Sequence, residues 1–236
     1  MNPARIAEQL EPYLGPYARH SQDRSDQKPS VLSPAQLQDI STYIDILLRW
    51  NTRINLTAIR DPEDIVTRHF GESFFAARLL FPDPAHAGTA GDLLAAVPAA
   101  ITVADLGSGA GFPGLPIKLW APQISLTLIE SNQKKATFLR EVTRALILTN
   151  VNIQTARAES LTGLAFDVVT LRAVERFETV LPTAASLLAH DGCLALLLGS
   201  SQLAAAKATL PQLAWSEPVP IPSSRSRIII VARRTA

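Results

Sequence analysis

The chain has 236 residues, of which 47% are hydrophobic, and its formal net charge at pH 7 is +1. This length suits one large α/β domain with an appendage, and the charge argues against a broadly basic surface that coats nucleic acid, while allowing a local basic patch. The single cysteine, Cys193, excludes an intrachain disulfide and lies among leucines, as a buried core residue would. We expect a cytoplasmic protein, because no signal peptide and no long apolar run are evident.

Residues 1–32 are predicted to be an N-terminal extension and linker. A short helix is expected at the start of this segment. The polar stretch from His20 to Lys28 cannot bury enough apolar surface to fix its own conformation, so it is expected to be a linker.

Residues 33–80 are predicted to form a helical element. Ser33-Pro34-Ala35-Gln36 has the form of a capping box, and apolar residues follow it at helical spacing as far as Trp50. The segment from Asn51 to Thr57 is rich in side chains that hydrogen-bond locally, which favours a loop. A second helix is expected from the Asp61-Pro62 cap to Leu80, and residues 81–100 are then a loose connection.

Residues 101–236 are predicted to form a mostly parallel, doubly wound α/β sheet, because strand and helix patterns alternate from Ile101 onward. The expected strands are 101–106, 125–130, 151–155, 166–171, 193–198 and 227–232. The expected helices are 132–148, 178–190 and 201–210.

A glycine loop follows the first of these strands. Asp105 ends the strand, and Gly107, Gly109 and Gly111 allow a backbone path that side chains would block. Pro113 and Pro116 stand where a helix can begin. Bare amides beside a positive helix end suit a nucleotide-type ligand.

The positions of two acids indicate which ligand. The spacing of Gly109, Gly111 and Gly114 also satisfies the dinucleotide pattern, so the loop alone does not separate NAD from S-adenosylmethionine. Asp105 would be awkward beside a pyrophosphate but suits a sulfonium and an ammonium group. Glu130, at the end of the second strand, can accept hydrogen bonds from a ribose in either case. We therefore favour S-adenosylmethionine, with an NAD-dependent oxidoreductase as the less favoured alternative.

Several motifs together resemble a known family. Trp50-Asn51, then Asn55-Leu56-Thr57, then Arg68-His69, and the segment from Asp105 to Pro116 closely resemble the small-subunit ribosomal RNA guanine-N7 methyltransferases, also called glucose-inhibited division protein B. The resemblance runs from about residue 33 to 173. It implies a Rossmann-like class I methyltransferase fold preceded by a helical element, and methyl transfer from S-adenosylmethionine to N7 of a guanine in 16S ribosomal RNA.

The resemblance also implies site residues. Carried over by position, the family's cofactor contacts fall on Gly107, Phe112, Ala158, Glu159 and Arg172. We add Asp105, Gly109, Gly111 and Glu130 from the loop argument.

The expected reaction needs little acid–base chemistry. Guanine N7 already offers a lone pair, so catalysis is expected to consist of aligning the reactants and excluding water. We assign positioning to Asn55, Arg68 and His69, and no certain catalytic residue. We expect residues 33–80 to be the substrate-recognition element. RNA binding is expected at Trp50, Asn51, Asn55, Arg68 and His69, whose side chains suit phosphates and an unstacked base.

Each assignment has a structural alternative. Trp50 ends an amphipathic helix and can be core, Asn51 and Asn55 can shape the loop, and His69 can be an ordinary helix histidine. The cations of the helix 132–148 can form a solvated face.

Two departures from the family bear on RNA contact. Glu72-Ser73 replaces the usual acid and serine conservatively, whereas Leu198 stands where the family often has a lysine, which removes an RNA-facing charge.

No metal site is expected, since the histidines lack carboxylate or cysteine partners. The expected partner is small-subunit ribosomal RNA or a ribosomal subunit, bound by a monomer. A non-catalytic, cofactor-binding RNA or ribosome-assembly protein stays open as an alternative.

Overall fold

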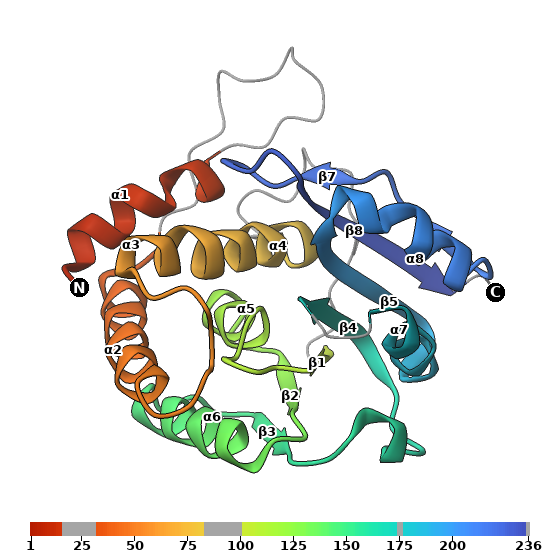
Figure 1. The fold of residues 1–236 in the computed structure, drawn as a ribbon, viewed down its shortest axis with the longest axis horizontal. Coiled ribbons are helices and arrows are strands. Elements are labelled where there is room, and N and C mark those ends of the chain that lie inside the picture. The colour runs from red at the N-terminus through yellow and green to blue at the C-terminus, as the bar shows by residue number, and fades with distance from the viewer. Residues whose placement is uncertain (16–31, 83–100, 174–176, 235–236) are drawn as a thin grey trace.

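The computed structural model describes residues 1–15, 32–82, 101–173 and 177–234. The predicted linker and connection therefore lie mainly outside the described residues. An eight-stranded sheet has the order β3-β2-β1-β4-β5-β8-β6, and β7 pairs with β8 (Figure 1). None of the described helices combines the length and apolar character that a membrane span requires.

The strands confirm the predicted mostly parallel α/β sheet. The five parallel strands are β1 (Thr102–Leu106), β2 (Ser125–Ile129), β3 (Val151–Gln154), β4 (Phe166–Arg172) and β5 (Leu188–Gly199). The antiparallel part consists of β6 (Leu213–Trp215), β7 (Val219–Pro220) and β8 (Arg227–Arg234).

Helices precede the sheet and connect its strands. The N-terminal helices are α1 (Pro3–Leu14), α2 (Pro34–Asn51), α3 (Pro62–Ile65), the π-helix η1 (Val66–Gly71) and α4 (Glu72–Leu80). Within the sheet region lie α5 (Gly114–Trp120), α6 (Gln133–Ala145), the 3₁₀ turns η3 (Ala158–Ser160) and η4 (Ser200–Gln202), α7 (Phe177–Ser186) and α8 (Leu203–Thr209).

The predicted helix starts have the expected caps. Ser33 Oγ accepts the backbone N–H of Gln36 at 3.2 Å, and Gln36 Oε1 accepts the N–H of Ser33 at 2.8 Å, which completes the capping box. Asp61 caps α3 through the N–H groups of Glu63 and Asp64. These caps satisfy amides that the first helical turn leaves unpaired.

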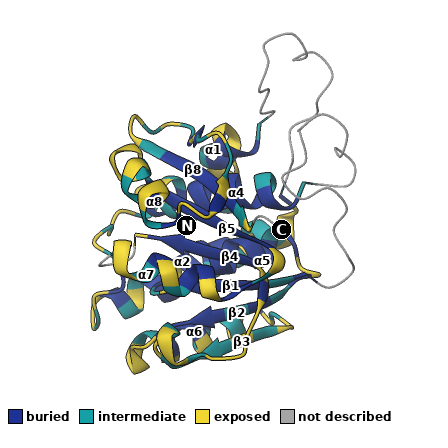
Figure 2. Cartoon of the chain, turned by 90° about the vertical axis from the view of Figure 1, so that its right-hand side faces the viewer, coloured by how far each residue is buried: buried dark blue, intermediate teal, exposed yellow. Residues whose placement is uncertain are grey.

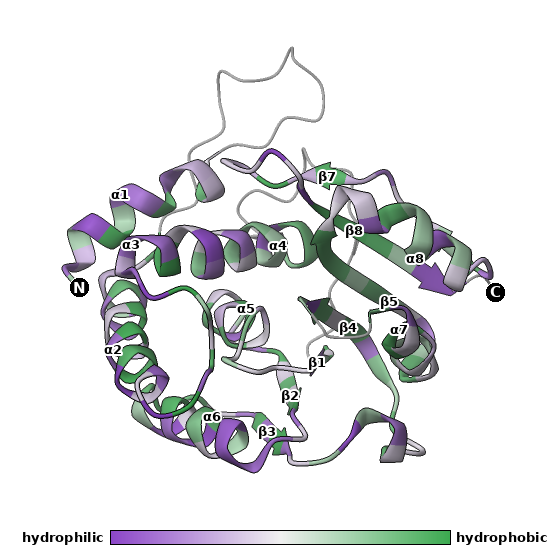
Figure 3. Ribbon diagram, in the orientation of Figure 1, coloured by the Kyte–Doolittle hydropathy of each residue, from purple (hydrophilic) through white to green (hydrophobic). Residues whose placement is uncertain are grey.

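Both faces of the sheet are covered by helices. Consecutive strand residues point to opposite sides, so neighbours in one strand belong to different cores. Val103 packs into a core with α1, α2, α4, α5 and α6, whereas Ala104 packs on the other side with α7 and α8. Figure 2 shows the buried strands between exposed helix surfaces, and Figure 3 shows that β5 and much of β8 are hydrophobic. The helical element thus shares its core with the sheet.

Helix α1 packs onto the helical element, and we call α1, α2, α3, η1 and α4 together the helical layer. It packs against η1, α2 and α4, and Gly71 accommodates it because a Cβ there would overlap the Tyr13 ring. Arg78 of α4 donates to the carbonyls of Tyr13 and Gly15 at 2.9 and 2.8 Å, which satisfies the end of α1. The N-terminal extension therefore contributes a packed helix and is more than a tail.

The expected helix 178–190 is wrong at its C-terminal end. Helix α7 stops at Ser186 and β5 begins at Leu188, which pairs with Phe166 ahead of a register shift in the ladder. Strand pairing with β4 overrides the local helical pattern there. The sequence analysis also missed β6 and β7, which are too short to show alternation.

Candidate functional site

The glycine loop lies at the carboxyl edge of the parallel strands. Gly107, Gly109 and Gly111 have φ angles of 71°, 55° and 85°, a region that glycine enters without a steric penalty. The N–H groups of Gly107 and Ser108 both donate to the Ile129 carbonyl, at 2.9 and 3.1 Å. The loop is thus anchored across the ends of β1 and β2.

Glu130 braces this loop. One carboxylate oxygen accepts the N–H of Gly109 at 2.9 Å and the other accepts the N–H of Asn132 at 2.7 Å. The residue is only 6% exposed. Each carboxylate oxygen can still accept a further hydrogen bond. Glu130 can therefore bind a ligand hydroxyl while it holds the loop.

A cavity of about 380 Å³ opens beside the loop. It brings together four of the predicted cofactor residues, Gly107, Glu130, Ala158 and Glu159. Leu106, Ile129 and Val180 give it apolar walls, and Ser131, Ala156 and Arg157 complete the lining. Apolar walls with a few polar groups are typical of cofactor sites.

Asp105 lies beneath the loop and does not line this cavity. It is 1% exposed, and its carboxylate accepts the Thr170 hydroxyl at 2.9 Å and the Gly114 N–H at 3.2 Å. Burial raises the pKa of Asp105 to about 6, although these hydrogen bonds oppose the rise. In this position Asp105 supports the start of α5, and a direct cofactor contact stays a prediction.

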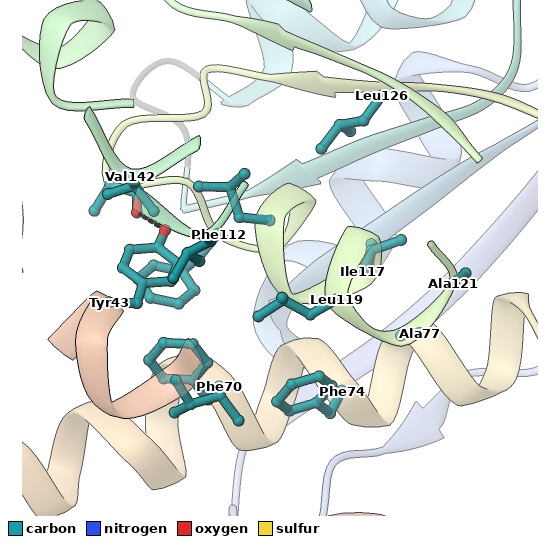
Figure 4. Close-up of a cluster of buried hydrophobic side chains, with 14 of the residues drawn as sticks. Tyr43, Phe70, Phe74, Ala77, Phe112, Ile117, Leu119, Ala121, Leu126 and Val142 are labelled. Atoms are coloured by element: carbon teal, nitrogen blue, oxygen red, sulfur yellow. Dashed lines mark hydrogen bonds between the residues drawn. The ribbon is translucent and has the colours of Figure 1, made fainter. Parts of the chain in front are cut away.

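Phe112 points from the loop into the helical layer. Its ring stacks on Tyr43 with centroids 5.3 Å apart and on His69 with centroids 4.6 Å apart. Phe70 meets the rings of both Tyr43 and Phe112 edge-on, and Figure 4 shows these three side chains together. The Phe112 side chain does not line the cavity, and a contact with the cofactor stays a prediction.

Arg172, at the end of β4, belongs to a buried ion cluster. Its guanidinium lies 3.1 Å from the Glu72 carboxylate and also donates to the Arg68 carbonyl. Arg227 of β8 lies 2.9 Å from the same Glu72 oxygen. Burial lowers the pKa of Arg172 to about 10, so it stays charged at neutral pH. The cluster joins the helical layer to the carboxyl edge.

His69 is neutral in this environment. Burial lowers its pKa to about 3, and the nearby charges of Arg172, Arg68 and Arg227 act in the same direction. Its Nε2 lies 2.8 Å from the Thr57 hydroxyl, and its buried Nδ1 has no hydrogen-bond partner among the described residues. His69 therefore connects the loop after α2 to the ring of Phe112.

Two further predicted RNA residues make internal contacts. Asn51 is 8% exposed, donates to the Thr57 carbonyl and accepts the N–H groups of Leu56 and Thr57. Trp50 packs on Phe138 of α6 and donates to Glu141 at 2.8 Å. These contacts match the structural alternatives, a loop-shaping asparagine and a packed indole.

Asn55 and Arg68 are the predicted RNA residues that the structure leaves exposed. Asn55 stands in the loop that Asn51 organises, and Arg68 stands on η1 beside the ion cluster. Asn55 is close in sequence to Thr57, whose hydroxyl contacts His69. Arg68 directly precedes His69, which stacks on Phe112 of the glycine loop.

Tyr43, Arg227 and the bridging role of Glu72 were not predicted from the sequence. Tyr43 looked like one more apolar position of α2, and Arg227 stands far from any motif. A signal for this role was Glu72 itself, an acid three residues after His69 at the start of a largely apolar segment.

The comparisons with known proteins agree with one another. A family model described as rRNA small subunit methyltransferase G matches residues 36–224. The ribosomal RNA small subunit methyltransferase G of Halorhodospira halophila is 36% identical over 221 residues, covering 92% of this chain and 97% of that protein. The protein of that name from Roseiflexus sp. (strain RS-1) is 36% identical over 217 residues, covering 87% and 86%.

A solved structure supports the same fold. The ribosomal protein L11 methylase from Lactobacillus delbrueckii subsp. bulgaricus superposes with a TM-score of 0.55 at 16% sequence identity, covering 71% of this chain and 79% of that one.

Proposed function

The chain belongs to the rRNA small subunit methyltransferase G family, and we propose that it transfers a methyl group from S-adenosylmethionine to N7 of a guanine in small-subunit ribosomal RNA. Membership of this family also decides against the NAD-dependent oxidoreductase that the glycine pattern alone would allow.

The cavity beside the glycine loop carries this proposal. It combines the buried carboxylate of Glu130, the bare backbone of Gly107 and apolar walls from Leu106 and Ile129. These groups fit S-adenosylmethionine, because a carboxylate suits ribose hydroxyls and apolar walls suit an adenine ring. Its position at the carboxyl edge, between the two sides of a doubly wound sheet, is where such folds bind ligands.

S-adenosylmethionine, when bound, supplies an activated methyl group. The protein has to hold the acceptor nitrogen in line with it and keep water away, and it has no proton to remove from N7. The neutral, stacked His69 and the internally paired Arg172 fit a supporting role better than an acid–base role.

We assign RNA contact to Asn55 and Arg68, which are exposed on the loop after α2 and on η1. Trp50, Asn51 and His69 are assigned to holding the loop after α2 in the shape that presents those residues. Phosphate contacts give affinity and are the usual role of an exposed arginine.

Substitution of Arg68 tests this assignment. Arg68→Ala should leave the dissociation constant for S-adenosylmethionine within about twofold and reduce methyl transfer to ribosomal RNA at least tenfold, a loss of about 1.4 kcal/mol. Lys207→Ala, which removes an exposed cation from α8, is the matched control and should change neither quantity. Equal losses in cofactor affinity and turnover would instead assign Arg68 to the cofactor pocket.

We further propose that the protein is cytoplasmic and acts as a monomer. Size-exclusion chromatography with light scattering measures the second point directly, and a mass of twice the 25.5 kDa chain would contradict it.

A further inference from the structure

Tyr43 connects the helical layer to the glycine loop. It lies on α2, is fully buried, and its hydroxyl donates to the Ala110 carbonyl at 2.5 Å. Within the described parts of the chain, no other side-chain hydrogen bond joins residues 33–80 to residues 107–114. The orientation of the Ala110 peptide therefore depends on a side chain outside the sheet.

The ring of Tyr43 is fixed on several sides. It stacks on Phe112 with an interplanar angle of 5°, and Phe70 packs against it edge-on with centroids 5.2 Å apart. Phe138 of α6 adds a third contact. Figure 4 shows Tyr43 enclosed beside Phe112 and above Phe70. A ring held in this way places its hydroxyl at a fixed height against the loop.

The loop is shaped to fit this hydroxyl. A Cβ on Gly111 would overlap the Tyr43 oxygen, so the absence of a side chain at Gly111 lets the phenol approach the backbone. The hydroxyl also keeps its proton for donation, because burial raises the pKa of Tyr43 well above its ordinary value.

Two side chains from different parts of the chain therefore hold neighbouring residues of the loop. Glu130 accepts the Gly109 N–H at the cavity, and Tyr43 donates to the Ala110 carbonyl on the side of the helical layer. Because the two contacted residues are consecutive, a change at either support alters the backbone path of the glycine loop, which borders the cavity at Gly107.

From this geometry, and resting on the proposed function, we propose that Tyr43 is a positioning residue for the cofactor, acting through the Ala110 carbonyl on the glycine loop. The helical layer then has a second role besides RNA contact, since it fixes the backbone conformation of the glycine loop that holds the methyl donor.

The test compares Tyr43→Phe with Tyr13→Phe. Tyr13 is also a buried tyrosine whose hydroxyl has a partner, Ser223, but it packs on Gly71 away from the loop. Each variant loses one neutral hydrogen bond, but only that of Tyr43 reaches the glycine loop. Calorimetry with S-adenosylhomocysteine should therefore show about fivefold weaker binding to Tyr43→Phe and unchanged binding to Tyr13→Phe. The KM for S-adenosylmethionine should rise by the same factor, with the KM for RNA within twofold.

A structural role alone would predict another pattern. Both variants would then lose thermal stability and keep wild-type affinity for S-adenosylhomocysteine, and this result would overturn the inference. Equal weakening in both variants would also overturn it. If the wild-type protein itself does not bind S-adenosylhomocysteine, the proposed function fails as well, whereas wild-type binding with an unaffected Tyr43→Phe refutes only the role of Tyr43.

Discussion

The Glu72 carboxylate lies 3.1 Å from the Arg172 guanidinium, and the two side chains are 4% and 5% exposed. Arg227 shares the same carboxylate oxygen at 2.9 Å. One buried acid therefore ties α4 to the ends of β4 and the start of β8, at the edge where the cofactor cavity lies.

Glu72→Ala should destabilise the fold by about 3–5 kcal/mol, because it leaves the buried guanidinium of Arg172 without its counter-charge. Urea unfolding followed by circular dichroism measures this loss. Glu63→Ala is the control, since Glu63 pairs with Arg5 at an exposed site, where solvent screens the attraction and an ion pair contributes little. Equal losses in free energy of unfolding for the two variants would show that the buried Glu72 cluster contributes no more to stability than an exposed ion pair.

His69 should make the stability depend on pH. Its pKa is about 3 in the folded chain, against 6.5 for the free side chain, so its contribution is complete above pH 6.5 and is lost as the pH falls and the unfolded state takes up a proton. The loss is about 1.4 kcal/mol per pH unit, or about 2 kcal/mol between pH 6.5 and 5.

Asp105 has the opposite effect on stability. Burial raises its pKa from 3.8 to about 6, so the folded chain takes up this proton first and gains stability as the pH falls from about 6 to 3.8. The comparison that isolates His69 is therefore wild type against His69→Gln. The stability advantage of the wild type should shrink by about 2 kcal/mol from pH 6.5 to 5, and a constant difference would contradict the assignment.

Ile147 offers a stabilising substitution. It follows α6 with a φ of 51° and is 85% exposed, so a β-branched side chain holds a left-handed conformation with little burial in return. Ile147→Gly should raise the free energy of unfolding by about 0.5–1 kcal/mol, after the greater freedom of glycine in the unfolded chain is subtracted. Ile147→Ala keeps the strain and should not give this gain.

The loop glycines should differ in their tolerance of a methyl group. At Gly109 the nearest atom to an added Cβ is the Gly107 carbonyl oxygen at 3.7 Å, so Gly109→Ala should cost only the conformational strain of about 1–2 kcal/mol. Gly111→Ala adds overlap with Tyr43 and Leu115 and should cost about 2–5 kcal/mol. Thermal unfolding of both variants measures the difference in stability. Equal losses would show that a side chain at Gly111 does not clash with Tyr43.

Local signals in the sequence were enough for most of the fold. The Ser33 capping box and the Asp61 cap each have a short-range physical cause and appear where expected. The first apolar strand, predicted over residues 101–106, spans 102–106. The end of α7 was mispredicted because Leu188 is placed by pairing with Phe166, a contact between strands that no local pattern records.

The candidate site was predictable in its loop and less so in its supports. Gly107 and Glu130 follow from the strand–glycine–helix pattern, which is local. The Tyr43 hydroxyl and the Glu72 cluster depend on contacts between residues more than 60 positions apart in the chain, such as Tyr43 with Ala110 at a separation of 67. A periodic apolar helix and an isolated acid do not reveal such contacts before the chain is folded.

The central claim is the transfer of one methyl group to N7 of guanine in small-subunit ribosomal RNA. The most direct measurement incubates the protein with methyl-labelled S-adenosylmethionine and either unmodified small-subunit RNA or undermethylated small subunits, then identifies the labelled nucleoside by mass spectrometry. The account predicts 7-methylguanosine at about one per RNA molecule in at least one of the two substrates. Label on another base or another atom, or no label in either substrate from a protein that binds both cofactor and RNA, would contradict it and leave a non-catalytic binding protein in its place.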